Sequence, residues 1–296
     1  MSIKVSNLSF SYGDRLILDN VDFEAEKNQF LSVLGPNAVG KTTLFRCMLG
    51  LLNGYEGQIL LNGIDIKSIG IREMAKMIAH IPQQHYPVFN FSVFDMVLMG
   101  TSVHLSSISS PGKKQMKLVD DALERLGIFH LKNRGYNQIS GGERQLVLMA
   151  RALVQEAKIL ILDEPTANLD FGNQVRVLTQ IKDLVKQGYT VIQSTHNPEQ
   201  TFLFSDMVMA MKDGKILAKG TPNTVFTSNL IRDLYGVEVE VKSLYDDKAR
   251  VCIPKSIIEQ EIENDFFVAR ESALSCTIGD EREQSTLTFK KSVQNA

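Results

Sequence analysis

The sequence predicts an α/β protein with a mainly parallel sheet, an antiparallel β subdomain at the N-terminus and an inserted helical subdomain. Residues 3–26 alternate apolar and polar side chains, as antiparallel strands with one solvated face do. Residues 158–162 and 189–193 are apolar runs typical of buried strands, and residues 174–186 between them have helical spacing. Strands that alternate with helices favour a parallel sheet.

The N-terminal elements follow a simple order. Residues 3–10 and 16–26 predict two strands around a tight turn at residues 12–14. Residues 30–34 form a near-continuous apolar run and lead into a loop containing glycine, after which residues 42–52 have helical spacing. This part of the chain therefore predicts a strand, a loop and a helix in succession.

The middle of the chain has a different character. Residues 93–99, 115–126 and 143–153 all have helical periodicity, and no convincing strand pattern lies among them. We interpret residues 91–154 as a helical subdomain inserted into a sheet domain that spans residues 1–236.

The C-terminal residues 237–296 are expected to form a separate extension. They contain twelve acidic and eight basic side chains, so they are more acidic than the rest of the chain. Residues 237–241 and 249–253 are candidates for two further strands. Residues 272–296 have little apolar periodicity, and we expect this distal part to be mobile.

Composition excludes several classes of protein. The 296 residues are 44% hydrophobic and 22% charged with a formal net charge of -2, which is ordinary for a folded chain and gives no overall attraction to nucleic acid. The three cysteines are widely spaced and fit a reducing cytosol better than a zinc site. No apolar run approaches the roughly 20 residues that span a bilayer, so we expect the chain not to enter a membrane by itself.

A phosphate-binding loop is predicted at residues 35–42, Gly-Pro-Asn-Ala-Val-Gly-Lys-Thr, which match the pattern G-x-x-x-x-G-K-[ST] between a predicted strand and a predicted helix. The glycines let backbone N–H groups close around phosphate oxygens, Lys41 reaches the phosphates and the Thr42 hydroxyl suits Mg²⁺. A loop that only turned the chain would need neither the lysine nor the hydroxyl.

Two carboxylates, Asp163 and Glu164, end the buried strand predicted at residues 158–162. Ligands of α/β sheets bind at the carboxyl ends of the strands. In ATPases with a phosphate-binding loop, an Asp at this point holds Mg²⁺ and a following Glu polarises the attacking water. The alternative is a simple strand end, which the pairing with Lys41 disfavours.

A second possible phosphate site begins the helix of residues 143–153. Ser140, Gly141, Gly142 and Glu143 provide a hydroxyl, unobstructed backbone amides and a helix N-terminus. A helix N-cap with a loop glycine would have the same pattern. The phosphate-binding interpretation of these residues is therefore favoured only together with the other motifs.

Together these motifs resemble the ATP-binding-cassette (ABC) ATPases, which are P-loop NTPases with a RecA-like sheet, and the resemblance covers residues 3–235. It implies that Tyr12 stacks on adenine, that Gln83 links the γ-phosphate and Mg²⁺ to the transport partner, and that His196 contacts the γ-phosphate as a switch. It implies catalytic roles for Glu164, His196, Lys41 and Gln83, and Mg²⁺ contacts for Thr42, Gln83 and Asp163. ATP contacts are implied for Tyr12, Gly35, Pro36, Asn37, Ala38, Val39, Gly40, Lys41, Thr42, Thr43, Ser140, Gly141, Gly142, Glu143 and Asp170.

The resemblance also implies partners. In that family two cassettes bind head to tail, so that residues 140–143 of one copy complete the ATP site of the other, with residues 168–170 across the same seam. One cassette per chain then implies a homodimer on the cytoplasmic face of the membrane, bound peripherally to a membrane-spanning permease dimer and served by an extracytoplasmic solute-binding protein.

Three positions depart from the family pattern: Ala38 replaces the usual Gly, Glu143 the commoner Gln and Leu146 the common Arg. None removes a reacting group. If position 38 requires a positive φ, alanine there costs on the order of 1 kcal/mol.

Residues 84–105 indicate which machine the ATPase drives. Val-Leu-Met-Gly at residues 97–100, followed by residues 101–105 with His104, is similar to importers of iron–siderophore, haem, cobalamin and molybdate or tungstate. For His104 itself a capping or surface role is favoured over that of a ligand.

The alternative is a non-transport ABC ATPase that acts with a soluble or nucleic-acid partner. Chromosome-maintenance ATPases need a long coiled coil between the two phosphate motifs, yet 99 positions without sustained heptads separate Lys41 from Ser140. No nucleic-acid partner is therefore expected. We expect residues 256–296 to be dispensable for hydrolysis, with residues 266–268 as the one cluster that could dock.

Overall fold

The computed structural model describes residues 1–83, 89–106 and 109–257. The predictions for residues 266–268 and 272–296 therefore lie outside the described residues. Within the described residues, no helix combines the length and the apolar character needed to cross a membrane.

The predicted α/β class is confirmed. A six-stranded sheet has the order β10-β9-β3-β8-β7-β6, in which β9, β3, β8, β7 and β6 run parallel and β10 pairs antiparallel with β9. Its strands are β3 (Phe30–Leu34), β6 (Ile78–Ile81), β7 (Ile159–Leu162), β8 (Thr190–Thr195), β9 (Met207–Lys212) and β10 (Lys215–Gly220).

The N-terminal strands form a separate antiparallel sheet of four strands in the order β2-β1-β4-β5. Its strands are β1 (Ile3–Tyr12), β2 (Arg15–Ala25), β4 (Glu56–Leu61) and β5 (Ile64–Asp65). The inward side chains of this sheet and of helix α1 (Lys41–Met48) share one apolar core with β3, β8 and β9. The helix ends earlier than predicted because Gly50 takes a left-handed φ of 66° just beyond its C-cap, Leu49.

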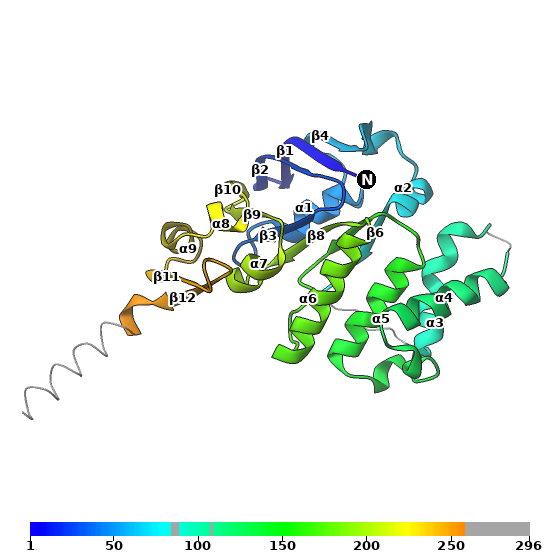
Figure 1. Cartoon of the computed structure of the whole chain (residues 1–296). Helices are drawn as coiled ribbons and strands as arrows, with labels where there is room; N and C mark the ends of the chain where they lie inside the picture. The colour runs from blue at the N-terminus through cyan, green and yellow to red at the C-terminus, as the bar shows by residue number, and fades with distance from the viewer. Residues whose placement is uncertain (84–88, 107–108, 258–296) are drawn as a thin grey trace, which may run out of the picture.

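Described residues between 91 and 154 form helices and no strand beyond one isolated bridge between Ser92 and Gly135. These helices gather on one side of the molecule, opposite the C-terminal hairpin (Figure 1). They are α3 (Val93–Leu98), η2 (Met99–His104), α4 (Lys113–Arg125), η3 (Phe129–Leu131), η4 (Tyr136–Gln138) and α5 (Gly141–Leu153).

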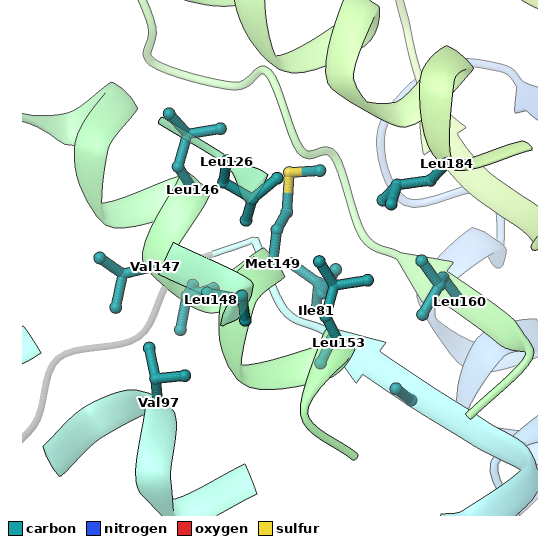
Figure 2. Packing of buried hydrophobic residues seen from close by; sticks show 14 of the residues in the cluster. Ile81, Val97, Leu126, Leu146, Val147, Leu148, Met149, Leu153, Leu160 and Leu184 are labelled. Carbon is teal, nitrogen blue, oxygen red and sulfur yellow. The ribbon is translucent and has the colours of Figure 1, made fainter. Parts of the chain in front are cut away.

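Helix α5 joins this helical segment to the sheet. It contacts α3, α4, β6 and α6 (Phe171–Lys186). Met149 and Leu153 of α5 lie among Ile81 of β6 and Leu160 of β7, while Val97 of α3 approaches from the other side (Figure 2). Because these side chains are almost fully buried, the apolar core fixes the direction in which the N-terminus of α5 points.

The remaining elements lie after β8 or before β6. They are η1 (Ile66–Ser68), α2 (Ile71–Met77), α7 (Pro198–Phe204), α8 (Pro222–Val225), α9 (Ser228–Tyr235), β11 (Val239–Leu244) and β12 (Ala249–Pro254). Strands β11 and β12 lie at the two candidate strands and pair as an antiparallel hairpin, which packs against α7 and α9.

Arg250 anchors this hairpin. Its guanidinium makes a bidentate pair with Asp247 at 2.6 and 2.7 Å, donates to the carbonyl oxygens of Asn223 and Phe226, and lies 5.2 Å from the centre of the Phe202 ring. One side chain therefore connects the hairpin to α7 and to the chain around α8.

We expect Arg250→Ala to lower the melting temperature by about 2–4 °C, because two carbonyl groups and the Phe202 ring lose their cationic partner. Differential scanning calorimetry measures the shift. Lys248→Ala, an exposed change on the same hairpin, is the control and should leave the melting temperature unchanged. Equal shifts for the two variants would contradict the anchoring role.

Candidate active site

Four of the predicted site segments meet at the carboxyl edge of the parallel sheet. Strand β3 leads into the loop at residues 35–40, β7 into Asp163 and Glu164, β8 into His196 and β6 into Gln83. The four strands are neighbours in the order β3-β8-β7-β6. Strands β3 and β8 end as a pair, as do β6 and β7, whereas β8 runs two residues past its pairing with the end of β7. The sheet therefore brings together side chains that are far apart in the sequence.

The loop between β3 and α1 adopts backbone conformations that favour glycine. Gly40, the N-cap of α1, has a φ of 105°, and a Cβ on Gly35 would lie 2.2 Å from the carbonyl oxygen of Met211. Ala38 also has a positive φ, of 65°, so the strain considered for this position is present. The N-terminus of α1, which favours negatively charged groups, opens onto the loop.

Lys41 is buried at the start of α1. Its Nζ donates to the carbonyl oxygens of Gly35 at 2.6 Å and Pro36 at 2.8 Å, and it lies 3.6 Å from Oε1 of Glu164. Burial lowers the pKa of the Lys41 ammonium, and the Glu164 carboxylate opposes that shift. An ammonium group held inside a glycine loop is well placed to receive an anion.

Asp163 is held by two hydroxyl groups. Thr42 Oγ1 donates to Oδ2 at 2.9 Å, and Ser194 Oγ donates to Oδ1 at 2.6 Å. The backbone N–H of Asp163 donates to the carbonyl of Ile81 on β6. A hydroxyl and a carboxylate at this distance offer the hard oxygen donors that a divalent cation such as Mg²⁺ prefers.

Glu164 lies at the centre of the polar side chains. It has a left-handed φ of 45°, and its side chain is 12% exposed. Gln83 Nε2 donates to Oε2 at 3.2 Å, and His196 Nδ1 lies 3.4 Å from the same oxygen. A carboxylate within reach of a cation, an amide and an imidazole can accept a proton from a water molecule.

Two adjoining cavities open onto these side chains. The first, of ≈ 360 Å³, is lined by Arg15, Ile17, Asn37, Ala38, Gly40, Lys41, Thr42, Thr43, Gln83 and Glu164. The second, of ≈ 270 Å³, is lined by Asn37, Gln83, Glu164, Thr166, Ala167, Asn168, Gln174, Thr195, His196, Asn197 and Gln200. Glu164 and Gln83 border both cavities. Three loop residues line neither cavity: the carbonyls of Gly35 and Pro36 accept from Lys41, and that of Val39 accepts from the backbone N–H of Gly214.

The structure does not bring every predicted residue to these cavities. Tyr12, at the end of β1, is 46% exposed and packs edge-on against Phe10, with ring centroids 4.9 Å apart. It does not line the first cavity, although its pairing partner Arg15 does. A contact between Tyr12 and a ligand in the first cavity would therefore involve a side chain that does not line that cavity.

Residues 140–143 also lie outside the lining of both cavities. Ser140 caps α5 by accepting from the Glu143 backbone, and Glu143 accepts from the Ser140 backbone N–H at 2.8 Å, which lowers the pKa of Glu143. A Cβ on Gly142 would lie 2.5 Å from the Asn173 side chain, so this segment packs closely against the start of α6. Asp170 caps the same end of α6 by accepting from the Asn173 backbone.

Sequence reasoning missed Ser194 and the amide side chains of Gln174 and Gln200. Gln200 accepts from the Thr166 hydroxyl at 3.0 Å and donates to Gln174 at 2.8 Å, so it connects α7 with the segment before α6. The available signal for Ser194 was a hydroxyl residue directly after the strand predicted at residues 189–193.

Comparison with known proteins agrees with this geometry. The sequence profile of the ABC transporter family matches residues 18–167. A Helicobacter pylori (strain J99) protein named as a probable iron chelatin transport ATP-binding protein is 42% identical over 250 residues, which cover 84% of this chain and 98% of the relative. The iron(3+)-hydroxamate import ATP-binding protein FhuC of Bacillus subtilis is 29% identical and covers 88% of this chain and 98% of its own length.

Among solved structures, one assigned as a metal-chelate type ABC transporter in an inward-facing conformation has a TM-score of 0.77 and 30% identity. The match covers 86% of this chain and 98% of that chain.

Replacement of Ala38 by glycine should increase the free energy of unfolding by about 0.5–1 kcal/mol, because glycine adopts the left-handed conformation without the clash of a Cβ. Urea denaturation without nucleotide measures the change. Ala218→Gly, in strand β10 and without a positive φ, is the matched control and should lower stability by about 0.5–1 kcal/mol. A loss of stability in Ala38→Gly equal to that of the control would contradict the strain.

Proposed function

This chain belongs to the ABC transporter family, and from that membership we propose that it is the ATP-hydrolysing subunit of a bacterial or archaeal importer for a metal chelate or metal oxyanion. The proposed cargo class is iron–siderophore, haem, cobalamin, or molybdate and tungstate. The relatives named for iron chelatin and iron hydroxamate import support this choice, as does the metal-chelate type structure. The observation that carries the proposal is the convergence of Lys41 and Glu164 on the cavity that the glycine loop lines, with Asp163 bonded to Thr42 at its edge.

The roles of the site residues follow from their contacts. We assign phosphate binding to the loop at residues 35–42, the N-terminus of α1 and Lys41, whose ammonium now contacts two carbonyl oxygens that a phosphate would replace. Glu164 is assigned as the base for the hydrolytic water, because its carboxylate lies within 3.4 Å of His196 and 3.2 Å of Gln83. His196, which is 53% exposed, is assigned to the γ-phosphate.

The site chemistry fits Mg²⁺. Thr42 and Asp163 provide oxygen donors 2.9 Å apart, and Gln83 is nearby. Among the described residues no group of three or more His, Cys, Asp or Glu side chains could hold a metal, which agrees with a cation that takes most of its ligands from phosphate and water. When bound, the cation would neutralise charge on the transferred phosphoryl group.

A second copy of the chain is the proposed partner for residues 140–143. These residues lie at an exposed helix N-terminus, outside both cavities, beside the N-terminus of α6 with Asp170. A helix N-terminus favours anions, so in a head-to-tail dimer this end could complete the phosphate site of the other copy. Tyr12 would then complete the adenine end from β1.

A membrane-spanning permease dimer, itself served by an extracytoplasmic solute-binding protein, is the second proposed partner, and it places the chain peripherally on the cytoplasmic face. Its docking site is assigned to an apolar groove of ≈ 460 Å³ lined by residues that follow α1, by residues of η1 and α2, and by Gln155. Leu51 and Ile71 in the groove are 64% and 90% exposed. The groove also contains His80, three residues before Gln83, and burial lowers the pKa of this imidazole. A short apolar helix of the permease would thus contact the strand that leads to the site.

Glu164→Gln and Lys41→Ala should fail in different ways. Glu164→Gln removes the base but keeps the shape, so hydrolysis should fall by about 10²–10⁴-fold while ATP still binds; Lys41→Ala should lose most ATP binding. Phosphate release and equilibrium nucleotide binding separate the two effects.

The matched control is Glu156→Gln, because Glu156 also has a positive φ, of 58°, but lies away from the site beside His104. It should keep normal turnover. Wild-type turnover in purified Glu164→Gln would refute the assignment of the base.

Leu51→Glu should abolish stimulation of hydrolysis by the permease and leave basal hydrolysis unchanged. A carboxylate buried in an apolar contact without a partner should weaken binding by about 10-fold or more. ATP turnover with and without the permease in proteoliposomes measures this. Ile64→Glu is the control, since Ile64 is 52% exposed and does not line the groove. Equal loss of stimulation in both variants, or in neither, would reject this docking site.

A further inference from the structure

Ser194 makes two hydrogen bonds to the acidic pair from a position inside the sheet. It is the fifth residue of β8, has no exposed surface, and stands two residues before His196. Its Oγ donates to Asp163 Oδ1 at 2.6 Å and accepts from the backbone N–H of Glu164 at 2.9 Å. Both the donor and the acceptor capacity of this hydroxyl are therefore directed at consecutive residues of the site.

The ladder between β7 and β8 explains why a side chain is needed at this point. The pairing of the two strands ends at Leu162 and Gln193, and the N–H of Asp163 then turns to Ile81 on β6. The next N–H, that of Glu164, bonds to the Ser194 hydroxyl instead of a strand carbonyl. Because a buried N–H without a partner is costly, the hydroxyl takes the place of a strand carbonyl where the chain leaves the sheet.

The same two bonds set the orientation of both carboxylates. Asp163 has one oxygen fixed by Ser194 and the other by Thr42, so its plane cannot rotate freely. Glu164 has a left-handed φ of 45°, which is unfavourable for a residue with a Cβ and needs support from its surroundings. The bond from its N–H to Ser194 provides that support and directs the side chain toward Lys41, Gln83 and His196.

We propose that Ser194 is a positioning residue for ATP hydrolysis, which orients Asp163 through its carboxylate and Glu164 through its backbone. This inference rests on the proposed function, because it takes its meaning from the assigned roles of those two residues. Ser194 is fully buried and lines neither cavity, so its assigned role is to position other residues. It acts by holding the strand of the acidic pair against the strand that carries His196.

The test compares Ser194→Ala with Ser32→Ala in the full-length chain. Ser32 is also fully buried, lies on the neighbouring strand β3, and bonds to Ser205 at 2.6 Å and Gln193 at 2.9 Å without touching a site residue. Each variant loses one buried, doubly bonded hydroxyl from the same sheet. The two should therefore lose similar stability in a thermal melt, which separates positioning from folding.

We expect Ser194→Ala to lower kcat for ATP by about 10–100-fold, the effect of losing a hydrogen bond to a charged group, while KM for ATP changes by less than about 3-fold. The Mg²⁺ concentration for half-maximal activity should rise, because Asp163 is no longer held. Ser194→Thr, which keeps the hydroxyl and suits a strand, should regain most of kcat. Ser32→Ala should leave all three quantities unchanged.

A second measurement does not depend on activity. Hydrogen exchange at the Glu164 amide, without nucleotide or metal, should become at least about 10-fold faster in Ser194→Ala and stay unchanged in Ser32→Ala. If wild type is active and Ser194→Ala keeps both its kcat and its slow Glu164 exchange, the positioning role is overturned. If pure wild-type protein binds ATP but does not hydrolyse it, even with the permease, the proposed function is wrong, and the positioning role that depends on it is wrong as well.

Discussion

The site depends on the hydrogen bonds that the carboxylate of Asp163 accepts. Asp163 accepts from Thr42, on the helix that follows the loop after β3, and from Ser194 on β8, while its own backbone donates to β6. One residue therefore connects four neighbouring strands at the edge where they end. This arrangement requires the strands to run parallel and to end at the same edge of the sheet, because only then do their following loops face the same cavity.

The two faces of the sheet supply different parts of this arrangement. One core joins the antiparallel sheet and α1 to the parallel strands, and it supports the loop of residues 35–40. A separate core joins α5, α6 and the helical segment to β6 and β7. Ser140 and Asp170 lie at helix N-termini supported by this second core. The loop of residues 35–40 and the residues proposed to reach another copy are therefore supported by different cores.

The sequence was sufficient to predict the parts of the site that follow from local pattern. The loop at residues 35–42 and the acidic pair after β7 each carry a local signal, as do the strands β11 and β12, and the α/β class is confirmed. Strands β4, β6, β9 and β10 were not among the predicted elements. The role of Ser194 could not be predicted, because it depends on the register between β7 and β8. The strain at Ala38 was predicted only for the case that its φ is positive, because a sequence does not show backbone angles.

A crystal structure of this chain with Mg²⁺ and a non-hydrolysable ATP analogue would test the account most directly. We predict that the phosphates lie against residues 35–42, that Lys41 Nζ exchanges its bonds to the carbonyl oxygens of Gly35 and Pro36 for a phosphate oxygen, and that Ser194 still holds Asp163. A nucleotide bound elsewhere, or a Lys41 that keeps both carbonyl bonds with the phosphates out of its reach, would contradict the account.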